Sequence, residues 1–210
     1  MIHCILCGSP ETLSLYRERN HRFLECTICS SVFRDPATFL NREEEEKRYL
    51  THNNDVEDPD YRQFVSPLVT AVLKDYPEPI TGLDFGAGTG PVIAHMLNEK
   101  GFKIELYDPF FHPDTSVLNR PYDLIVCCEV IEHFHRPIQE FELLHSLLNP
   151  GGKLYCMTDP LPKITSFADW YYKEDPTHVI FYSEENLNHI KRAVGFSGVS
   201  ISNRLITFER

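Results

Sequence analysis

Four short segments rich in apolar residues stand out after residue 79, and turn residues or helical spacing separate them. They cover residues 80–85, 102–107, 122–128 and 153–158. Apolar segments of this length, bounded by turn signals, are typical of the buried strands of a parallel sheet. The pattern predicts an α/β fold with a Rossmann-like, mostly parallel sheet.

Helical spacing predicts the elements that connect these strands. Val92, Ile93 and Leu97 share one helical face, and Gly101 ends that helix. The last two strands are expected to turn at Asn203 and to close the edge of the sheet. The other elements expected here are helices over 137–148 and 183–193 and strands over 198–202 and 205–208.

The chain is more polar over residues 36–79, which we interpret as a helical linker or cap. A helix is expected over 41–50, where acids come first and bases last, as the helix dipole favours. The acidic run 43–46 is expected to be a solvated face. A second, amphipathic helix is expected over 61–76, bent or started by Pro67.

Two Cys-x-x-Cys pairs, separated by eighteen residues, lie within residues 1–35. This spacing is that of a four-cysteine zinc ribbon formed by Cys4, Cys7, Cys26 and Cys29. Chance pairing of reduced thiols is the alternative. Four thiolate ligands leave no open coordination position, so the predicted zinc is structural. The ribbon strands are expected over 13–16 and 22–25.

Composition narrows the function classes. The 210 residues carry a net charge of −11, which disfavours a broad nucleic-acid groove but leaves a local contact open. No apolar stretch has the length of a membrane span, and no signal peptide is evident at the N-terminus. We therefore expect a cytoplasmic protein without a membrane partner. Acidity favours a small-molecule or protein partner over RNA.

The turn after the first of these strands carries the strongest chemical signal. It reads D-F-G-A-G-T-G from Asp84 to Gly90, and Pro91 follows at the helix start. The dinucleotide fingerprint G-x-G-x-x-G fails, because Pro91 stands where its third glycine would be. Asp108 ends the next strand, about twenty residues on, the usual place for an acid that binds ribose hydroxyls.

This D-x-G-x-G-x-G pattern resembles motif I of the class I S-adenosylmethionine (SAM) dependent methyltransferases. The sequence E-V-I-E-H at 129–133, which follows the expected strand over 122–128, resembles the same family. So does the N-P-G-G turn at 149–152. The resemblance implies SAM as cofactor. The family's adenine-side acid has no clear counterpart in this chain, and we expect Phe110 and Phe111 to flank the adenine instead. The residues that it assigns to SAM are Asp84, Gly86, Ala87, Gly88, Gly90, Asp108, Pro109, Phe110, Glu129 and His133.

The chain departs from the family after Asp108. Only fourteen residues separate Asp108 from Asp123, and three of them are prolines. A full class I domain places a helix, a strand and a helix in this interval. We therefore expect its third strand to be short or missing. In such folds the segment before the sheet often covers the cofactor, so Tyr49, His52 and Asn53 either face SAM or belong to a surface linker.

Methyl transfer to a hydroxyl or amine benefits from a base, and histidine suits this role near neutral pH. The catalytic candidates are His133, His178 and Glu129, with His135 beside them. We expect the imidazoles of His133 and His178 within about 12 Å of each other, as one small substrate requires. The long loop over 159–178, which contains Trp170, is expected to close over them.

The grouping of Glu129, Glu132 and His133 with the distal His178 allows a second interpretation. It resembles the metal motif of the small-RNA 2′-O-methyltransferases and of some quinone O-methyltransferases. These four residues would then hold a divalent metal that acidifies a substrate hydroxyl. In methyltransferases without a metal, the same segment lines the SAM pocket.

Two functions follow from these features. The first is a SAM-dependent methyltransferase that acts on a small molecule or a protein. The second is a non-catalytic module, in which the zinc ribbon binds a protein partner and the methyltransferase fold is a scaffold. The expected domains are a zinc ribbon over 1–35, a linker or cap over 36–79 and a methyltransferase domain over 80–210.

Overall fold

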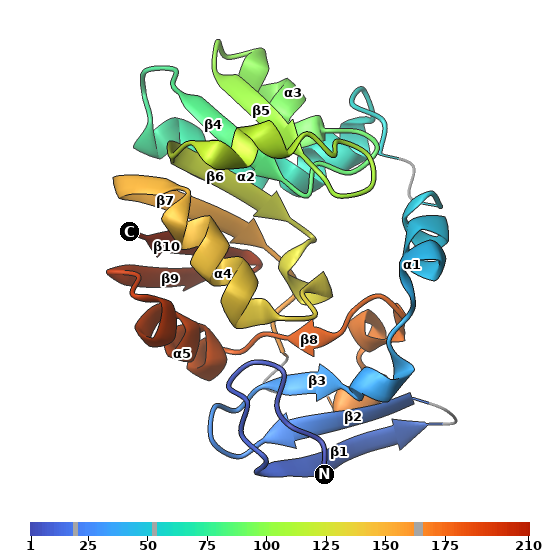
Figure 1. Cartoon of the computed structure of the whole chain (residues 1–210). Coiled ribbons are helices and arrows are strands. Elements are labelled where there is room, and N and C mark those ends of the chain that lie inside the picture. Colours follow the sequence, from blue (N-terminus) through green and yellow to red (C-terminus); the bar gives the residue numbers. More distant parts are fainter. Residues whose placement is uncertain (19–20, 52–53, 162–165) are drawn as a thin grey trace.

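A computed structural model describes residues 1–18, 21–51, 54–161 and 166–210. Two sheets organise these residues (Figure 1). The larger has six strands in the order β5-β4-β6-β7-β10-β9, and the smaller has four in the order β1-β2-β3-β8. The smaller sheet lies below the larger one in Figure 1, and α1 runs along the side between them.

The larger sheet confirms the expected Rossmann-like fold. Four neighbouring strands are parallel, and β10 pairs antiparallel with both β7 and β9. Asn203 makes the last turn with a φ of 53°. The six strands are β4 (Thr81–Phe85), β5 (Lys103–Tyr107), β6 (Tyr122–Cys128), β7 (Leu148–Met157), β9 (Gly198–Ser202) and β10 (Leu205–Glu209).

Helices cover both faces of this sheet, which explains why its central strand is continuously apolar. Leu124 and Val126 of β6 pack on one face with α2 and α3. Ile125 and Cys127 pack on the other face with α4 and α5. All four side chains are fully buried. The helices are α2 (Pro59–Asp75), α3 (Val92–Asn98), α4 (Pro137–Ser146) and α5 (Glu184–Val194).

The interval between β5 and β6 is reduced, as expected. Residues 109–121 are all described, and they form no strand and only the 3₁₀ helix η2 (Thr115–Asn119). The other short 3₁₀ helices among the described residues are η1 (Pro36–Thr38), η3 (Ile131–His133), η4 (Phe167–Asp169) and η5 (Tyr171–Glu174). The strand β7 begins earlier than expected, because Leu148 already pairs with Tyr122 before the N-P-G-G turn.

The expected helices before the sheet are present. Helix α1 (Arg42–Tyr49) begins with a capping box, in which the Asn41 side chain and Glu44 satisfy each other's backbone N–H groups. Pro67 lies inside α2 and does not start it. None of the helices formed by the described residues combines the length and the apolar character that crossing a membrane requires.

The N-terminal strands form a ribbon that is larger than the sequence predicts. The ribbon contains β1 (Thr12–Glu18), β2 (His21–Cys26) and β3 (Val32–Arg34). Its fourth strand, β8 (Ile180–Phe181), comes from the end of the 159–178 loop and pairs antiparallel with β3. Strand β8 was not expected, because a two-residue strand leaves no periodic pattern.

Candidate active site

The glycine turn follows β4 and begins α3, as predicted, and two of its glycines are required by their surroundings. Gly86 has a φ of +84°, and a Cβ there would overlap the side chain of Val130. A Cβ on Gly90 would overlap the carbonyl oxygen of Asn54. The turn therefore lies between the strand end of β6 and the segment before α2, with bare backbone on both sides.

Asp108 lies at the end of β5 and is 7% exposed. Its Oδ2 accepts from the Gly88 N–H at 3.0 Å, and its Oδ1 accepts from the N–H groups of Phe110 (2.8 Å) and Phe111 (3.1 Å). Asp108 thus holds the glycine turn and its own turn in place. This clamp is a role that the sequence did not predict. Each carboxylate oxygen has further lone-pair capacity for a ligand.

A cavity of about 1200 Å³ opens between the glycine turn and the carboxyl ends of the strands. Every residue that the resemblance assigns to SAM lines it, and so do His135 and His178. Tyr49 lines it too, as one of the two interpretations expected, whereas His52 and Asn53 lie outside the described residues. Further lining residues, which sequence reasoning missed, are Arg42, Glu45, Arg48, Asn54, Tyr61 and Phe64.

The structure brings His133 and His178 together, with ring centroids 4.9 Å apart. The Nδ1 atom of His133 is 2.9 Å from the Thr177 carbonyl, and that of His178 is 2.7 Å from the Tyr172 carbonyl. A carbonyl only accepts, so both rings carry their hydrogen on Nδ1 and keep Nε2 free of it. Burial lowers the pKa of His133. Burial, together with repulsion from His133 when that ring is protonated, lowers the pKa of His178 to about 3. Both rings are neutral at pH 7.

Two acidic residues follow β6 at the same edge. Glu129 has a φ of 52°, an uncommon conformation for a non-glycine residue and one that concentrates at functional sites. Its carboxylate accepts from Arg204 at 2.8 Å and from the Tyr172 hydroxyl at 3.0 Å. Glu132 is fully buried and contacts the same hydroxyl. Burial raises the pKa of both carboxyls to about 7.

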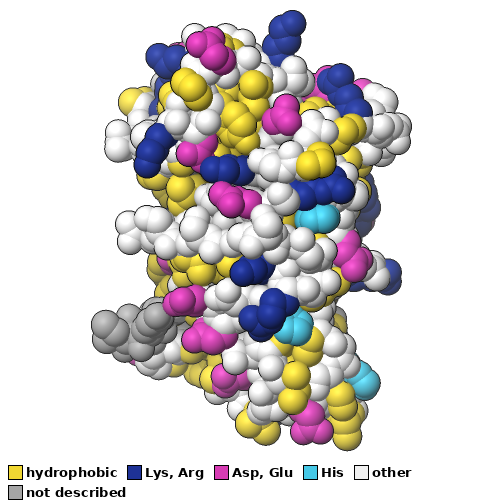
Figure 2. All heavy atoms as spheres, turned by 90° about the vertical axis from the view of Figure 1, so that its left-hand side faces the viewer, with side chains coloured by type: hydrophobic (Ala, Val, Ile, Leu, Met, Phe, Trp, Pro, Cys, Tyr) yellow, Lys and Arg dark blue, Asp and Glu magenta, His cyan; other side chains and the backbone are white. Residues whose placement is uncertain are grey.

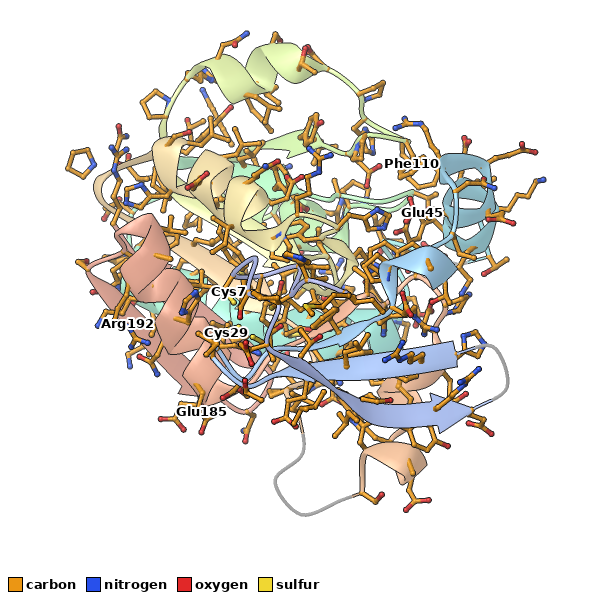
Figure 3. The ribbon with its side chains drawn as sticks, turned by 60° about the horizontal axis from the view of Figure 1, so that its bottom comes forward. Cys7, Cys29, Glu45, Phe110, Glu185 and Arg192 are labelled. Carbon is orange, nitrogen blue, oxygen red and sulfur yellow. The ribbon has the colours of Figure 1, made fainter. Side chains whose placement is uncertain are left out.

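One face of α1 forms a wall of the cavity, although every position on it except Tyr49 is charged. Arg42 lies 4.6 Å over the ring of Phe110 and donates to the Pro109 carbonyl. The Glu45 carboxylate is 2.9 Å from His135 Nε2, and its side chain is only 13% exposed. Figure 3 shows Glu45 and Phe110 on the side of α1 that faces the sheet. The expectation that all of 43–46 is solvated is therefore wrong for Glu45, because its carboxylate turns towards His135.

The 159–178 loop does contribute residues to the cavity lining, but Trp170 is not one of them. The Trp170 side chain is 6% exposed and packs with Phe23 and Val32 of the ribbon, and its indole donates to Asp159. It does not line the cavity. Its neighbour Tyr172 does, with its ring centroid 4.1 Å from that of His178. The indole of Trp170 is buried in the apolar cluster of the ribbon, and Tyr172 lines the cavity in its place.

The four ribbon cysteines lie together. One potential ligand atom from each falls within 4.8 Å of the others, and the Cys4–Cys29 and Cys7–Cys26 sulfur pairs are each 3.6 Å apart. Four sulfurs at zinc-bond length around one ion would be about 3.8 Å apart, given bonds of about 2.3 Å in a tetrahedron. Figure 3 shows Cys7 and Cys29 close together at one end of the ribbon.

The two Cys-x-x-Cys turns have the same local structure. In each, the residue after the second cysteine donates its N–H to the carbonyl of the first: Gly8 to Cys4, and Ser30 to Cys26, both at 2.9 Å. Both Gly8 and Ser30 have positive φ angles, of 75° and 55°. The side chains and the backbone of this site fit a zinc ribbon.

A second potential metal cluster contains three of the four residues that the sequence suggested as ligands of a divalent metal. Ligand atoms of Glu132, His133 and His178 lie within 4.8 Å of one another. The Oε2 atom of Glu132 is buried and has no hydrogen-bond partner among the residues that the structure describes, so it has capacity for a ligand. Glu129, the fourth residue, instead pairs with Arg204.

The model of a methyltransferase domain family matches residues 58–201, more than half of the chain. The chain belongs to this family. The ribbon strands β1–β3 and helix α1 lie before the matched region.

Similar proteins agree with this assignment. The ubiquinone biosynthesis O-methyltransferase of Stutzerimonas stutzeri is 27% identical over 90 residues, which cover 42% of this chain and 39% of that enzyme. The corresponding enzyme of Aeromonas salmonicida is 28% identical over 80 residues, covering 38% of this chain and 33% of that one. The match thus spans about two fifths or less of these relatives.

Solved structures share the fold. A SAM-dependent methyltransferase from Archaeoglobus fulgidus superposes with a TM-score of 0.56 at 15% identity, over 71% of this chain and 94% of that one. The 1,6-didemethyltoxoflavin-N1-methyltransferase of Burkholderia thailandensis, solved with bound 1,6-didemethyltoxoflavin and S-adenosylhomocysteine, has a TM-score of 0.54 at 15% identity. It covers 93% of this chain and 97% of its own. The chain has the α/β fold of these methyltransferases.

Proposed function

We propose that the chain transfers a methyl group from SAM to an acceptor held beside His133 and His178. The observation that carries this proposal is that the glycine turn, Asp108 and the adjacent rings of His133 and His178 meet at one cavity. At about 1200 Å³ the cavity exceeds the usual upper size of a single ligand pocket, about 1000 Å³, so it has room for two ligands.

The residues take separate roles in this proposal. Asp108 and the bare backbone of the glycine turn bind the nucleoside part of SAM, and Phe110 covers the adenine. SAM supplies an electrophilic methyl group. One of the two histidines, His133 or His178, accepts the acceptor's single proton at Nε2, because the Nδ1 hydrogen of each ring is held by a backbone carbonyl. Tyr172 and α1 exclude water from the reacting groups.

We propose a hydroxyl on a small molecule as the acceptor group. Part of the cavity lining is aromatic and includes Tyr61, Phe64, Tyr171 and Tyr172. The curated relatives are named as O-methyltransferases of ubiquinone biosynthesis, which supports an oxygen acceptor. A protein side chain is the second acceptor class.

Calorimetry with S-adenosylhomocysteine tests the donor site. We expect one binding site per chain, and at least ten-fold weaker binding in Asp108→Asn, because charge-assisted hydrogen bonds are lost. Asp114→Asn is the matched control, since the Asp114 carboxylate only caps η2 through the Ser116 N–H. No binding by the wild type would favour the non-catalytic scaffold.

Cys4, Cys7, Cys26 and Cys29 would hold one structural zinc ion, which supplies folding energy to a ribbon with little core of its own. A competing proposal for the acceptor site is a divalent cation on Glu132, His133 and His178, which would acidify the acceptor hydroxyl. Elemental analysis of the wild type and of Cys7→Ser counts the metal ions per chain and so distinguishes a ribbon zinc alone from a ribbon zinc with a second cation. One metal per chain that disappears in Cys7→Ser supports zinc alone, whereas a second metal that remains in this variant supports the cation.

A further inference from the structure

The segment 172–178 carries two cavity residues, Tyr172 and His178, yet it has little regular structure of its own. It contains only the end of η5 and one short turn, in which the His178 N–H donates to the Asp175 carbonyl at 3.2 Å. Irregular segments at this depth need partners for their carbonyl groups from elsewhere in the chain.

Those partners come largely from one side chain of the ribbon. Arg34, on β3, is 1% exposed. Its Nη2 donates to the carbonyls of Lys173 (2.9 Å) and Asp175 (3.0 Å), and its Nε donates to the carbonyl of His178 (3.1 Å). The planar guanidinium therefore joins three carbonyls that lie within six positions of the chain.

Other residues of the ribbon fix the Arg34 side chain on the side away from the cavity segment. Its Nη1 is 2.7 Å from His21 Nδ1, and its guanidinium lies 4.8 Å over the ring of Phe23. Its backbone N–H donates to the Val179 carbonyl at 2.8 Å, next to the β3–β8 pairing. Arg34 thus has fixed neighbours on the ribbon side and fixed neighbours on the cavity side.

We propose that Arg34 is a positioning residue for the cavity, which fixes segment 172–178 and so sets the place and tautomer of His178. The Tyr172 carbonyl that accepts the His178 Nδ1 hydrogen lies directly before the three carbonyls that Arg34 gathers. If these carbonyls lose their donor, they turn towards other donors, and the Tyr172 carbonyl moves with them. The relevance to catalysis rests on the proposed function, whereas the positioning itself does not.

Nuclear magnetic resonance of the histidine side chains, together with amide hydrogen exchange, tests this proposal without an acceptor. In Arg34→Met we expect loss of the His178 Nδ1–H signal of the wild type. We expect about ten-fold or faster exchange of the His178 and Val179 amides, because the segment opens locally. Arg17→Met is the matched control, an exposed arginine on β1 of the same ribbon.

Arg34→Lys keeps the charge but cannot reach three carbonyls with one ammonium group. It should show the same losses, and it decides the question if Arg34→Met does not fold. In Arg34→Ala, added methylguanidinium should restore the His178 signal. A folded Arg34→Met or Arg34→Lys with wild-type His178 signal and exchange would overturn the proposal.

Measuring S-adenosylhomocysteine affinity in the same samples distinguishes the positioning role of Arg34 from the proposed methyl-transfer function. Arg34 does not line the cavity, so its variants should keep the affinity within about three-fold of the wild type. A wild type that binds no S-adenosylhomocysteine but shows the Arg34 effects would reject the proposed function and leave the positioning role standing.

Discussion

At the scale of single residues, the cavity depends on glycine positions where a Cβ atom would overlap a neighbouring residue. Gly86 and Gly90 were identified from the sequence, because their spacing matches a known turn. Their actual neighbours, Val130 and Asn54, could not be identified, since both come from other parts of the chain. The same holds for Asp108, whose position was predicted but whose clamp on Gly88 depends on how two strand ends meet.

Gly86→Ala should destabilise the protein more than Gly151→Ala. Both glycines have φ near +80°, so both variants lose about 1–2 kcal/mol to left-handed backbone strain. Only at position 86 does the new methyl meet a neighbour, which adds about 1–3 kcal/mol of overpacking. Urea denaturation measures both values, and Val130→Ala should recover part of the Gly86→Ala loss. Equal losses at the two glycines would contradict this account.

The buried carboxyl of Asp84 should make the free energy of unfolding depend on pH. Burial raises the pKa of its carboxyl to about 7, well above that of the unfolded chain. Between pH 4 and pH 7 the unfolded chain loses this proton while the folded protein keeps it, so rising pH lowers stability. Asp84→Asn removes the effect and should gain up to about 1.4 kcal/mol per pH unit relative to the wild type in this range.

Denaturation midpoints at several pH values measure this difference. Asp75→Asn is the control of opposite sign, because hydrogen bonding to Lys153 lowers the pKa of Asp75. The stability difference between that variant and the wild type should stay constant above about pH 5. A difference between Asp84→Asn and the wild type that is flat from pH 4 to pH 7 would show that Asp84 is not buried as a neutral acid.

At the scale of elements, apolar periodicity predicted the larger sheet and its helices well, because those elements bury one or both faces. Helix α1 was predicted from its charge pattern, but apolar periodicity could not show which side faces the cavity, because Arg42, Glu45 and Arg48 on that side are all charged. A search for charged residues at helical spacing beside Tyr49 would have found this face. The 3₁₀ turns of the 159–178 loop and strand β8 carry no comparable signal, because each is only two to four residues long.

Helix α1 should be held to the cavity by Arg48 more than by its exposed charges. Arg48 pairs with Asp175 at 2.6 Å, and the Asp175 side chain is 13% exposed. Burial alone would raise the pKa of Asp175, but hydrogen bonds from Thr177 and Arg48 keep it below its usual range. Arg48→Met should cost about 1 kcal/mol after solvent screening of the half-exposed arginine.

Lys47→Met is the control for this change. Its partner Glu43 is 77% exposed, so the pair should contribute nothing measurable. Thermal unfolding of the two variants gives the comparison. Equal melting temperatures for Arg48→Met and Lys47→Met would mean that α1 does not depend on the contact with Asp175.

At the scale of the whole molecule, the ribbon and the methyltransferase fold are joined more closely than separate motifs suggested. The sequence predicted the zinc-ribbon spacing and the donor turn, but not the shared β3–β8 sheet or the burial of Trp170 against the ribbon. Both depend on pairing between residues about 150 positions apart. On the face shown in Figure 2, charges of both signs are interspersed, with no basic stripe of the kind that nucleic acid requires.

Removal of the proposed ribbon zinc should change the environment of Trp170. This residue is the only tryptophan of the chain, and it packs against Phe23 and Val32 of the ribbon. A chelator, or Cys7→Ser, should unfold the ribbon and shift Trp170 emission to longer wavelength as water reaches the indole. Cys128→Ser, away from the ribbon, is the control. Zinc loss measured in parallel without an emission change would contradict the coupling.

A crystal structure with bound S-adenosylhomocysteine tests the central claim most directly. We expect the nucleoside against Asp108 and the glycine turn, and the sulfur on the side of His133 and His178, so that a methyl group on it would face their free Nε2 atoms. S-adenosylhomocysteine bound elsewhere, or with its sulfur turned away from both histidines, would contradict the account of this cavity as the methyl-transfer site.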